Sequence, residues 1–528
     1  MNPYGTFIFL IAGIIISLFF GISKKEAVKI FIFVIVCFLL TSAFFINIYG
    51  FLLNENFSSN LFTSGIVEVI EIAVILFFAI ICISVIFIYH RNNNHFIKII
   101  IIFLFLIICV LTLIISKNFI AFFISLSCFL ISFFAITTVL NDSRFQILIN
   151  NDNIKESKIL FLKFDTLRSI IRFCIATLFF IVLLFYGFSI LYGVTDVKNF
   201  LQLFQNIEPA GINIILSLII ISIAFYIYLG LFPFQAPYIN FSNKAEPSSL
   251  YLLWLFYFPA GIFALLKFLP IILILNKNLK AGSYILYVLL LTVFLSSIGS
   301  GIGGLKTKSL RKISSYIFTL IITGYFINMI ILISGFIKEQ DFNGLNIFYL
   351  LLIVLSFLPV IFILSFIENS LKKDSIENIK SLIYKNKYIG IVFLISVFSL
   401  AGIPGFFGYI GQKYYIDLIV NIINIKTKLN GLNRIQGWLI LLVLIIYTAA
   451  FIAVYLRLII IIFIKRNKED NDSVDNYNFS KKFYILVGIF ALLIIFSGIM
   501  GLLETLNPQI NLFGFRITNS AIFIKNLK

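Results

Sequence analysis

Residues 389–424 read IGIVFLISVFSLAGIPGFFGYIGQKYYIDLIVNIIN, an apolar run interrupted by Gly402, Pro404 and Gly405. A helix needs only about 20 apolar residues to cross a bilayer, so this run is too long for one straight span. Proline removes a backbone hydrogen bond and glycine lowers helix propensity, so the run should break where they cluster. The stretch therefore predicts a membrane helix that is interrupted within the bilayer.

The same composition extends over the whole chain, which has 528 residues, 61% of them hydrophobic and only 12% charged. A soluble domain is about half apolar and about a quarter charged, so lipid must solvate most of this chain. We expect an all-α, polytopic membrane protein with about 14 transmembrane helices. The apolar runs lie near 4–22, 28–52, 64–89, 97–115, 118–140, 169–193, 210–232, 249–275, 283–303, 313–336, 346–366, 389–424, 437–464 and 483–503.

The net charge of +18 comes from basic residues in the short loops between these runs. With the N-terminus placed outside, 26 of the 40 basic residues fall in inside loops, and 11 fall in outside loops and the C-terminal tail. This asymmetry predicts the orientation and excludes nucleic acid as the partner. No basic n-region precedes the first run, so we expect a membrane helix there rather than a cleaved signal peptide.

Cofactor ligands are scarce in the sequence. The five cysteines lie in five different apolar runs, and His90 and His95 share one loop. This pattern favours neither a metal site nor a haem site, and we expect no cofactor bound by this chain. The sequence also lacks a GxxxxGK[ST] loop, which excludes a self-contained ATP-driven pump.

A second proline interrupts the seventh run at Leu231-Phe232-Pro233-Phe234, five runs before the break at Pro404. Paired breaks at corresponding places predict two repeats of about five helices with inverted orientation, in which helices 7 and 12 are broken. We divide the chain into N-terminal helices (1–115), a first repeat (97–275), a second repeat (283–464) and a C-terminal helix with its tail (483–528).

Three basic residues lie inside the spans, where each charge costs about 2.5–3.5 kcal/mol on insertion scales. Lys413 and Asp417 are one turn apart, so they form either a proton-handling site or a structural ion pair. Lys267 lies near the end of its run, and we expect its side chain to reach the outer surface. Arg457 also lies near a helix end, where it has either a surface role or a role in the proton pathway.

Several segments resemble one family. Residues 183–196 (LLFYGFSILYGVTD) are similar to the end of the sixth helix of subunit N of NADH-quinone oxidoreductase. Residues 399–404 (SLAGIP), followed by Gly408, Gly411 and Tyr414, resemble the broken twelfth helix of the wider antiporter-like group. The break at Pro233 with Ala245-Glu246-Pro247-Ser248 resembles the seventh helix and its following loop, and Tyr455-Leu456-Arg457 resembles a motif of helix 13.

The resemblance implies a membrane-arm subunit of respiratory complex I, beside other antiporter-like subunits in a multi-pass membrane setting. It implies proton translocation driven by quinone reduction elsewhere, with NADH and quinone used by the complex rather than by this chain. The isolated chain would then catalyse nothing. We expect a bacterial inner membrane, with an organellar inner membrane as the alternative.

The residues depart from the family at its ionisable positions. The glutamate of helix 5 falls at Cys128, or at Ser127 if the register shifts by one. The lysines of helices 7, 8 and 12 fall at Tyr228, Tyr257 and Gln412, with Lys413 next to the last. A neutral tyrosine or glutamine can join a hydrogen-bonded chain but holds no mobile charge near neutral pH. Proton movement is therefore either degenerate or rebuilt around Lys413.

Two other function classes stay open. The first is a subunit of a cation/proton antiporter or of a membrane-bound hydrogenase with the same fold. The second is a lipid or polysaccharide flippase, which needs a polar cavity lined by several cations, whereas only Lys267, Lys413 and Arg457 lie within the spans.

Overall fold

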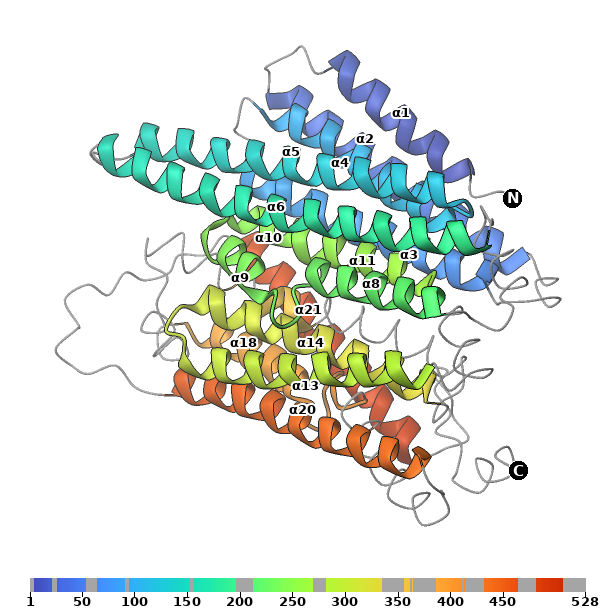
Figure 1. Ribbon diagram of the computed structural model, residues 1–528. Coiled ribbons are helices and arrows are strands. Elements are labelled where there is room, and N and C mark those ends of the chain that lie inside the picture. The colour runs from blue at the N-terminus through green and yellow to red at the C-terminus, as the bar shows by residue number, and fades with distance from the viewer. Residues whose placement is uncertain are drawn as a thin grey trace. The chain divides into compact units, whose positions relative to one another are not determined.

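The computed structural model describes residues 4–20, 26–53, 64–90, 95–151, 156–195, 212–268, 282–334, 356–360, 363, 386–410, 413, 432–463 and 481–506. Every described element is a helix, which confirms the all-helical fold class (Figure 1). The chain divides into two compact units. Unit 1 comprises Met1–Leu229 and Asn240–Gly282, and unit 2 comprises Gly230–Ile239 and Ser283–Lys528.

Unit 1 is built from consecutive helices that pack against their sequence neighbours. These helices are α1 (Tyr4–Phe20), α2 (Glu26–Leu53), α3 (Ser64–His90), α4 (Phe96–Ile115), α5 (Phe119–Asn151), α6 (Glu156–Thr195), α8 (Ile212–Tyr228), α10 (Pro247–Leu252), the π-helix η1 (Leu253–Tyr257) and α11 (Phe258–Leu266). The short helix α9 (Gln235–Lys244) follows the first break. Unit 2 contains α13 (Gly282–Lys306), α14 (Leu310–Ile333), α18 (Lys387–Ala401), α20 (Leu432–Phe463) and α21 (Lys481–Leu506).

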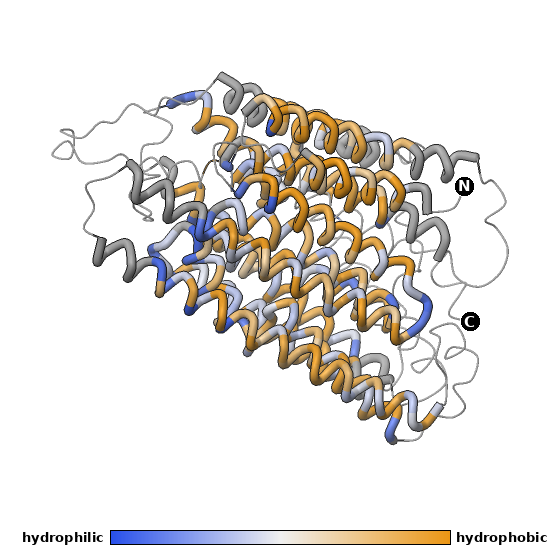
Figure 2. Tube along the Cα trace, turned by 90° about the horizontal axis from the view of Figure 1, so that it is seen from above, coloured by the Kyte–Doolittle hydropathy of each residue, from blue (hydrophilic) through white to orange (hydrophobic). Residues whose placement is uncertain are grey.

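Length and composition mark many of these helices as membrane spans. Among the described residues, eight helices are long and apolar enough to cross a membrane, and five shorter helices are also apolar. Figure 2 shows hydrophobic residues along most of the coloured length of the long helices, with hydrophilic residues mainly near their ends. The expected span 346–366 falls largely outside the described residues.

Burial separates central helices from lipid-facing ones within each unit. The spans Ser248–Leu266 in unit 1 and Arg311–Ile333 in unit 2 are each 94% buried. In contrast, α1 and α6 expose apolar side chains such as Phe19, Ile175 and Phe179. A helix that is apolar all round belongs in the core of a bundle, whereas exposed apolar faces suit contact with lipid.

Helices α5 and α6 are longer than their apolar runs. The expected runs end at 140 and begin again at 169, whereas α5 continues to Asn151 and α6 begins at Glu156. The hydropathy pattern locates the part of a helix that lies in lipid and does not locate its end. Residues 119–168 contain neither glycine nor proline, so no helix breaker ends α5 or starts α6 at the border of its apolar run. The two helices lie side by side as an antiparallel pair (Figure 1).

Both expected breaks are present. Helix α8 ends at Tyr228, Gly230 has a φ of 65°, and Phe232–Pro233 is a cis peptide before α9. Helix α18 ends at Ala401, and Gly402 caps it with a φ of 74°. This left-handed conformation at the end of a helix favours glycine. The predictions at Pro233 and Pro404 are therefore confirmed, whereas the number of helices and the inverted repeat stay predictions.

Candidate functional site

Two of the predicted site residues, Tyr228 and Tyr257, meet in the core of unit 1. Their rings stack with centroids 4.2 Å apart and an angle of 5° between the planes. The Tyr228 hydroxyl donates to the Tyr257 carbonyl at 2.7 Å, and the Tyr257 hydroxyl donates to the Tyr228 carbonyl at 3.2 Å. Both side chains are buried. We call this arrangement the tyrosine pair.

Irregular backbone positions the tyrosine pair. Tyr228 is the last residue of α8, where a carbonyl has no following helical amide to accept from. Tyr257 is the last residue of η1, a π-helical turn directly before α11. Pro259 lacks the amide that would bond to the Leu255 carbonyl in a regular α-helix, which is a local reason for the wider turn.

Gly261 of α11 makes room for the Tyr228 ring. A Cβ atom at this position would lie 2.2 Å from Cε1 and 2.5 Å from Cδ1 of Tyr228. Two phenylalanine rings pack against the tyrosine pair. The ring centroid of Phe180 lies 4.7 Å from that of Tyr228, and the ring centroid of Phe133 lies 5.1 Å from that of Tyr257. The tyrosine pair is thus a neutral, aromatic site whose hydroxyl groups already have acceptors, and it holds no charge near neutral pH.

The other predicted residues are described less completely. Cys128 is a half-buried free thiol on α5. Lys413 is partly buried and helical, beyond the break in unit 2. Gln412 and Asp417 lie outside the described residues, so the expected ion pair of Lys413 with Asp417 stays a prediction.

The partners of Lys267 were not expected. Its ammonium group donates to the carbonyls of Ile114 and Ser116 at 2.7 and 2.5 Å, and whether the side chain lies at the outer surface stays a prediction. Ile114 and Ser116 lie at the C-terminal end of α4, where carbonyls lack intrahelical donors and where a cation is favoured by the helix dipole. Lys267 therefore ties the end of α11 to the end of α4.

Arg457 of α20 likewise binds carbonyls at a helix end, in unit 2. Its guanidinium donates to the carbonyl of Gly304, and Nη2 donates to the Thr307 carbonyl at 2.7 Å. Both carbonyls lie at the C-terminal end of α13. The observed contact is that of a helix cap, while a role in a proton pathway stays a prediction.

We expect Arg457→Met to destabilise unit 2 by about 1.5–3 kcal/mol, because the substitution removes hydrogen bonds from a charged donor to carbonyls at a helix end. The check is the fraction of purified chain that stays monodisperse on size-exclusion chromatography after heating. Lys306→Met is the matched control, since Lys306 is an exposed residue at the same helix end. Equal thermal midpoints for the two variants would contradict the capping role.

Unit 2 also contains a line of neutral polar groups beside the first break. The Phe232 amide donates to Ser296 Oγ at 3.0 Å, and Gln235 Nε2 donates to Ser300 Oγ at 3.0 Å. Thr319 Oγ1 donates to the same Ser300 oxygen at 2.9 Å. These hydroxyls were not among the residues expected to form a site, although Ser296 and Ser300 are four residues apart and so share a helix face.

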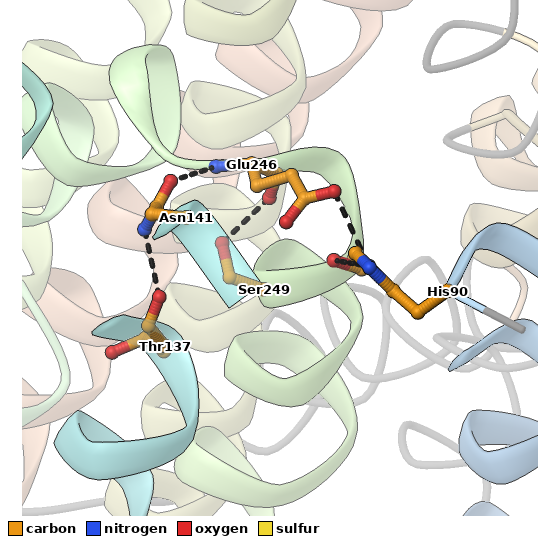
Figure 3. A network of polar contacts seen from close by, with 6 residues as sticks. His90, Thr137, Asn141, Glu246 and Ser249 are labelled. Carbon is orange, nitrogen blue, oxygen red and sulfur yellow. Dashed lines mark hydrogen bonds and ion pairs between the residues drawn. The ribbon is translucent and has the colours of Figure 1, made fainter. Parts of the chain in front are cut away.

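A polar network in unit 1 was also missed (Figure 3). His90 Nε2 at the end of α3 lies 3.2 Å from Glu246 Oε1 and 3.0 Å from Ser248 Oγ. Asn141 of α5 accepts a hydrogen bond from the Glu246 amide at 3.0 Å and donates to the Thr137 carbonyl at 2.8 Å. His90, Asn141, Glu246 and Ser248 lie between the expected apolar runs, and Thr137 lies near the end of the run 118–140. The scarcity of histidine was the one signal that pointed to His90.

The fold and these sites define a polytopic membrane protein with interrupted helices. A family model described as "NADH:quinone oxidoreductase/Mrp antiporter, TM" matches residues 159–429, just over half of the chain. The chain belongs to this family, which confirms the resemblance found at the two breaks.

Individual proteins support the same family. The chain is 26% identical to NADH-quinone oxidoreductase subunit N of Rickettsia bellii over 44% of its own length and 48% of the relative's. It spans about half the length of the curated relatives it matches. A chain of respiratory complex I from Thermus thermophilus has a TM-score of 0.66 at 14% identity, covering 94% of this chain and 98% of that one. A chain of the archaeal membrane-bound sulfane sulfur reductase has a TM-score of 0.69 at 15% identity, covering 100% and 99%. At these identities the structures support the fold alone.

Proposed function

We propose that this chain is a membrane-arm subunit of a proton-translocating NADH-quinone oxidoreductase. The observation that carries the proposal is that the family match spans both helix breaks, at Pro233 and Pro404. The curated relatives that it matches are named subunit N of that enzyme, which supports the same assignment. NADH and quinone would react on other subunits, and this chain would bind no cofactor.

The two units differ in what they offer to proton movement. Unit 1 carries the neutral tyrosine pair at the positions where the resemblance implies lysines. Unit 2 carries Lys413, a partly buried cation beyond the broken α18. We propose that the lysine switch is absent from unit 1 and that Lys413 is the principal titratable group of unit 2 within the membrane.

The test is purification of the tagged chain from the membranes of its source organism at native expression. We expect it to co-purify with other membrane-arm subunits in a bacterial inner membrane, and the complex should oxidise NADH with a quinone acceptor. The isolated chain should show no redox spectrum. NADH oxidation by the isolated chain, or a purified complex without any quinone reductase activity, would refute the proposal.

A cation/proton antiporter is the second candidate, because the family description itself includes the Mrp antiporter. The same purification separates the two. Antiporter subunits in place of redox subunits, together with cation exchange in reconstituted vesicles, would favour the second candidate.

A further inference from the structure

We propose that His90 and Glu246 form the proton-accepting site of unit 1, at the end of the unit that the loop charges assign to the inner face. The proposal rests on the proposed function, since it names the group that takes up protons in that reaction. It does not involve the tyrosine pair, which is neutral.

The geometry lets the pair hold one shared proton. Nε2 of His90 and Oε1 of Glu246 lie 3.2 Å apart. Either the imidazole donates its N–H to the carboxylate, or the protonated carboxyl donates its O–H to the imidazole. Uptake of a proton forms one N–H or O–H bond, and release breaks that bond, so no other reactant is needed.

Burial of the pair favours the state with one shared proton over the states with none or two. The His90 side chain is 1% exposed and the Glu246 side chain is 9% exposed. A net charge is costly in such surroundings, whereas the pair with one shared proton is neutral overall. A second proton, or loss of the first, leaves a buried net charge and drives transfer onward.

Glu246 also keeps one oxygen available. Its Oε2 atom is buried and has no hydrogen-bond partner among the described residues. A buried carboxylate oxygen without a donor is costly, so this atom is a place for an incoming proton donor such as water. The opposite oxygen binds His90, and the two oxygens thus give the carboxyl an entry and an exit for protons.

The backbone of Glu246 is fixed independently of its carboxyl group. Its amide donates to Asn141, and its carbonyl accepts from Ser249 Oγ at 2.5 Å. Glu246 is also the residue before the first turn of α10, where a negative charge is favoured by the helix dipole. Substitution of the carboxyl alone should therefore leave the local fold in place.

Other ionisable groups on the packed elements complete the electrostatic setting. Helices α2, α4 and α10 and the π-helix η1 pack against α3, and α5 packs against α10. The charged or histidine side chains described on these elements are Lys29 on α2, Glu71 on α3, His95 and Lys98 at the start of α4, and Asp142 on α5. The phenols are Tyr251 on α10 and Tyr257 on η1, and the thiols are Cys37, Cys82, Cys109 and Cys128. The Lys244–Asp165 ion pair joins α9 to α6. Glu71 is 19 residues before His90, or about 28 Å along the helix, and is too distant to share the site.

The experiment uses the assembled complex reconstituted into vesicles, with wild-type chain, His90→Gln, Glu246→Gln and the matched control Asp165→Asn. Asp165 is a carboxylate in an ion pair of the same unit, but its side chain is 34% exposed. Infrared difference spectra between about pH 5 and about pH 8, the range in which histidine titrates, report protonation of buried carboxyl groups. Protons released per electron are measured on the same vesicles during quinone reduction.

We expect the wild-type spectrum to contain a buried-carboxyl band that is lost in Glu246→Gln, shifted in His90→Gln and kept in Asp165→Asn. Both site variants should lower the protons released per electron, with proton transfer through unit 1 slowed about 100-fold. An unchanged spectrum or an unchanged proton ratio in assembled Glu246→Gln complex would overturn the proposal. A wild-type complex that reduces quinone without releasing protons would instead overturn the proposed function, so the two failures are distinguishable.

Discussion

Replacement of Lys413 by alanine is expected to lower the number of protons released per electron in the assembled complex. Lys413 is a partly buried cation beyond the interrupted helix α18. Loss of a positioned proton-transfer group slows that transfer by about 100-fold or more. Quinone reduction and proton release should therefore be measured together on reconstituted vesicles, so that a lower ratio is separated from a lower turnover.

Tyr228→Phe is the matched control for this prediction. The substitution keeps the stacked ring and removes one hydroxyl, whose bond to the Tyr257 carbonyl is worth about 1 kcal/mol. The proton ratio should stay nearly unchanged, because the hydroxyl carries no charge near neutral pH. If Lys413→Ala alters neither rate nor ratio while assembly is intact, unit 2 does not carry protons through Lys413.

Gly261→Ala is expected to destabilise unit 1 by about 3 kcal/mol, the upper end of typical overpacking costs. The new methyl group would lie 2.2 Å from the Tyr228 ring, which is held by its stack and by its hydroxyl bond. Thermal unfolding can be followed with a thiol-reactive fluorophore, because Cys82 and Cys109 are buried free thiols of the same unit. The variant should react at a lower temperature than wild type.

Two comparisons make this result specific. Gly193→Ala on α6 meets nothing within 4 Å, so this variant should be as stable as wild type or slightly more stable. In a Tyr228→Ala background the clash is absent, and adding Gly261→Ala should cost little, as a double-mutant cycle would measure. Equal unfolding temperatures for Gly261→Ala and Gly193→Ala would mean that the Tyr228 ring does not lie against α11.

The sequence predicted the spans and the breaks because both depend on local chemistry. Apolar runs overlap the long described helices, although α9 falls outside every run, and glycine with proline marked the breaks at Pro233 and Pro404. The ends of α5 and α6 were not predicted, because no local residue stops either helix where its apolar run ends.

The sequence predicted which residues belong to the tyrosine pair but not how their side chains contact each other. The family resemblance pointed to Tyr228 and Tyr257 separately, but their reciprocal hydrogen bonds depend on how α8 meets η1. The contact of His90 with Glu246 joins α3 to the start of α10, and no periodic pattern connects two such distant residues. Arg457 and Lys267 were recognised as costly charges, while their carbonyl partners could come only from the packing.

The tyrosine pair also limits which side chains position 228 can accept. A lysine at position 228 alone would lose the stack on Tyr257 and would enter a neighbourhood lined by Phe180 and Phe225. Such a charge costs about 2.5–3.5 kcal/mol on insertion scales unless a partner arrives with it. Gly261 would at the same time face a space that no longer holds a ring. A charged side chain at position 228 therefore requires several substitutions together.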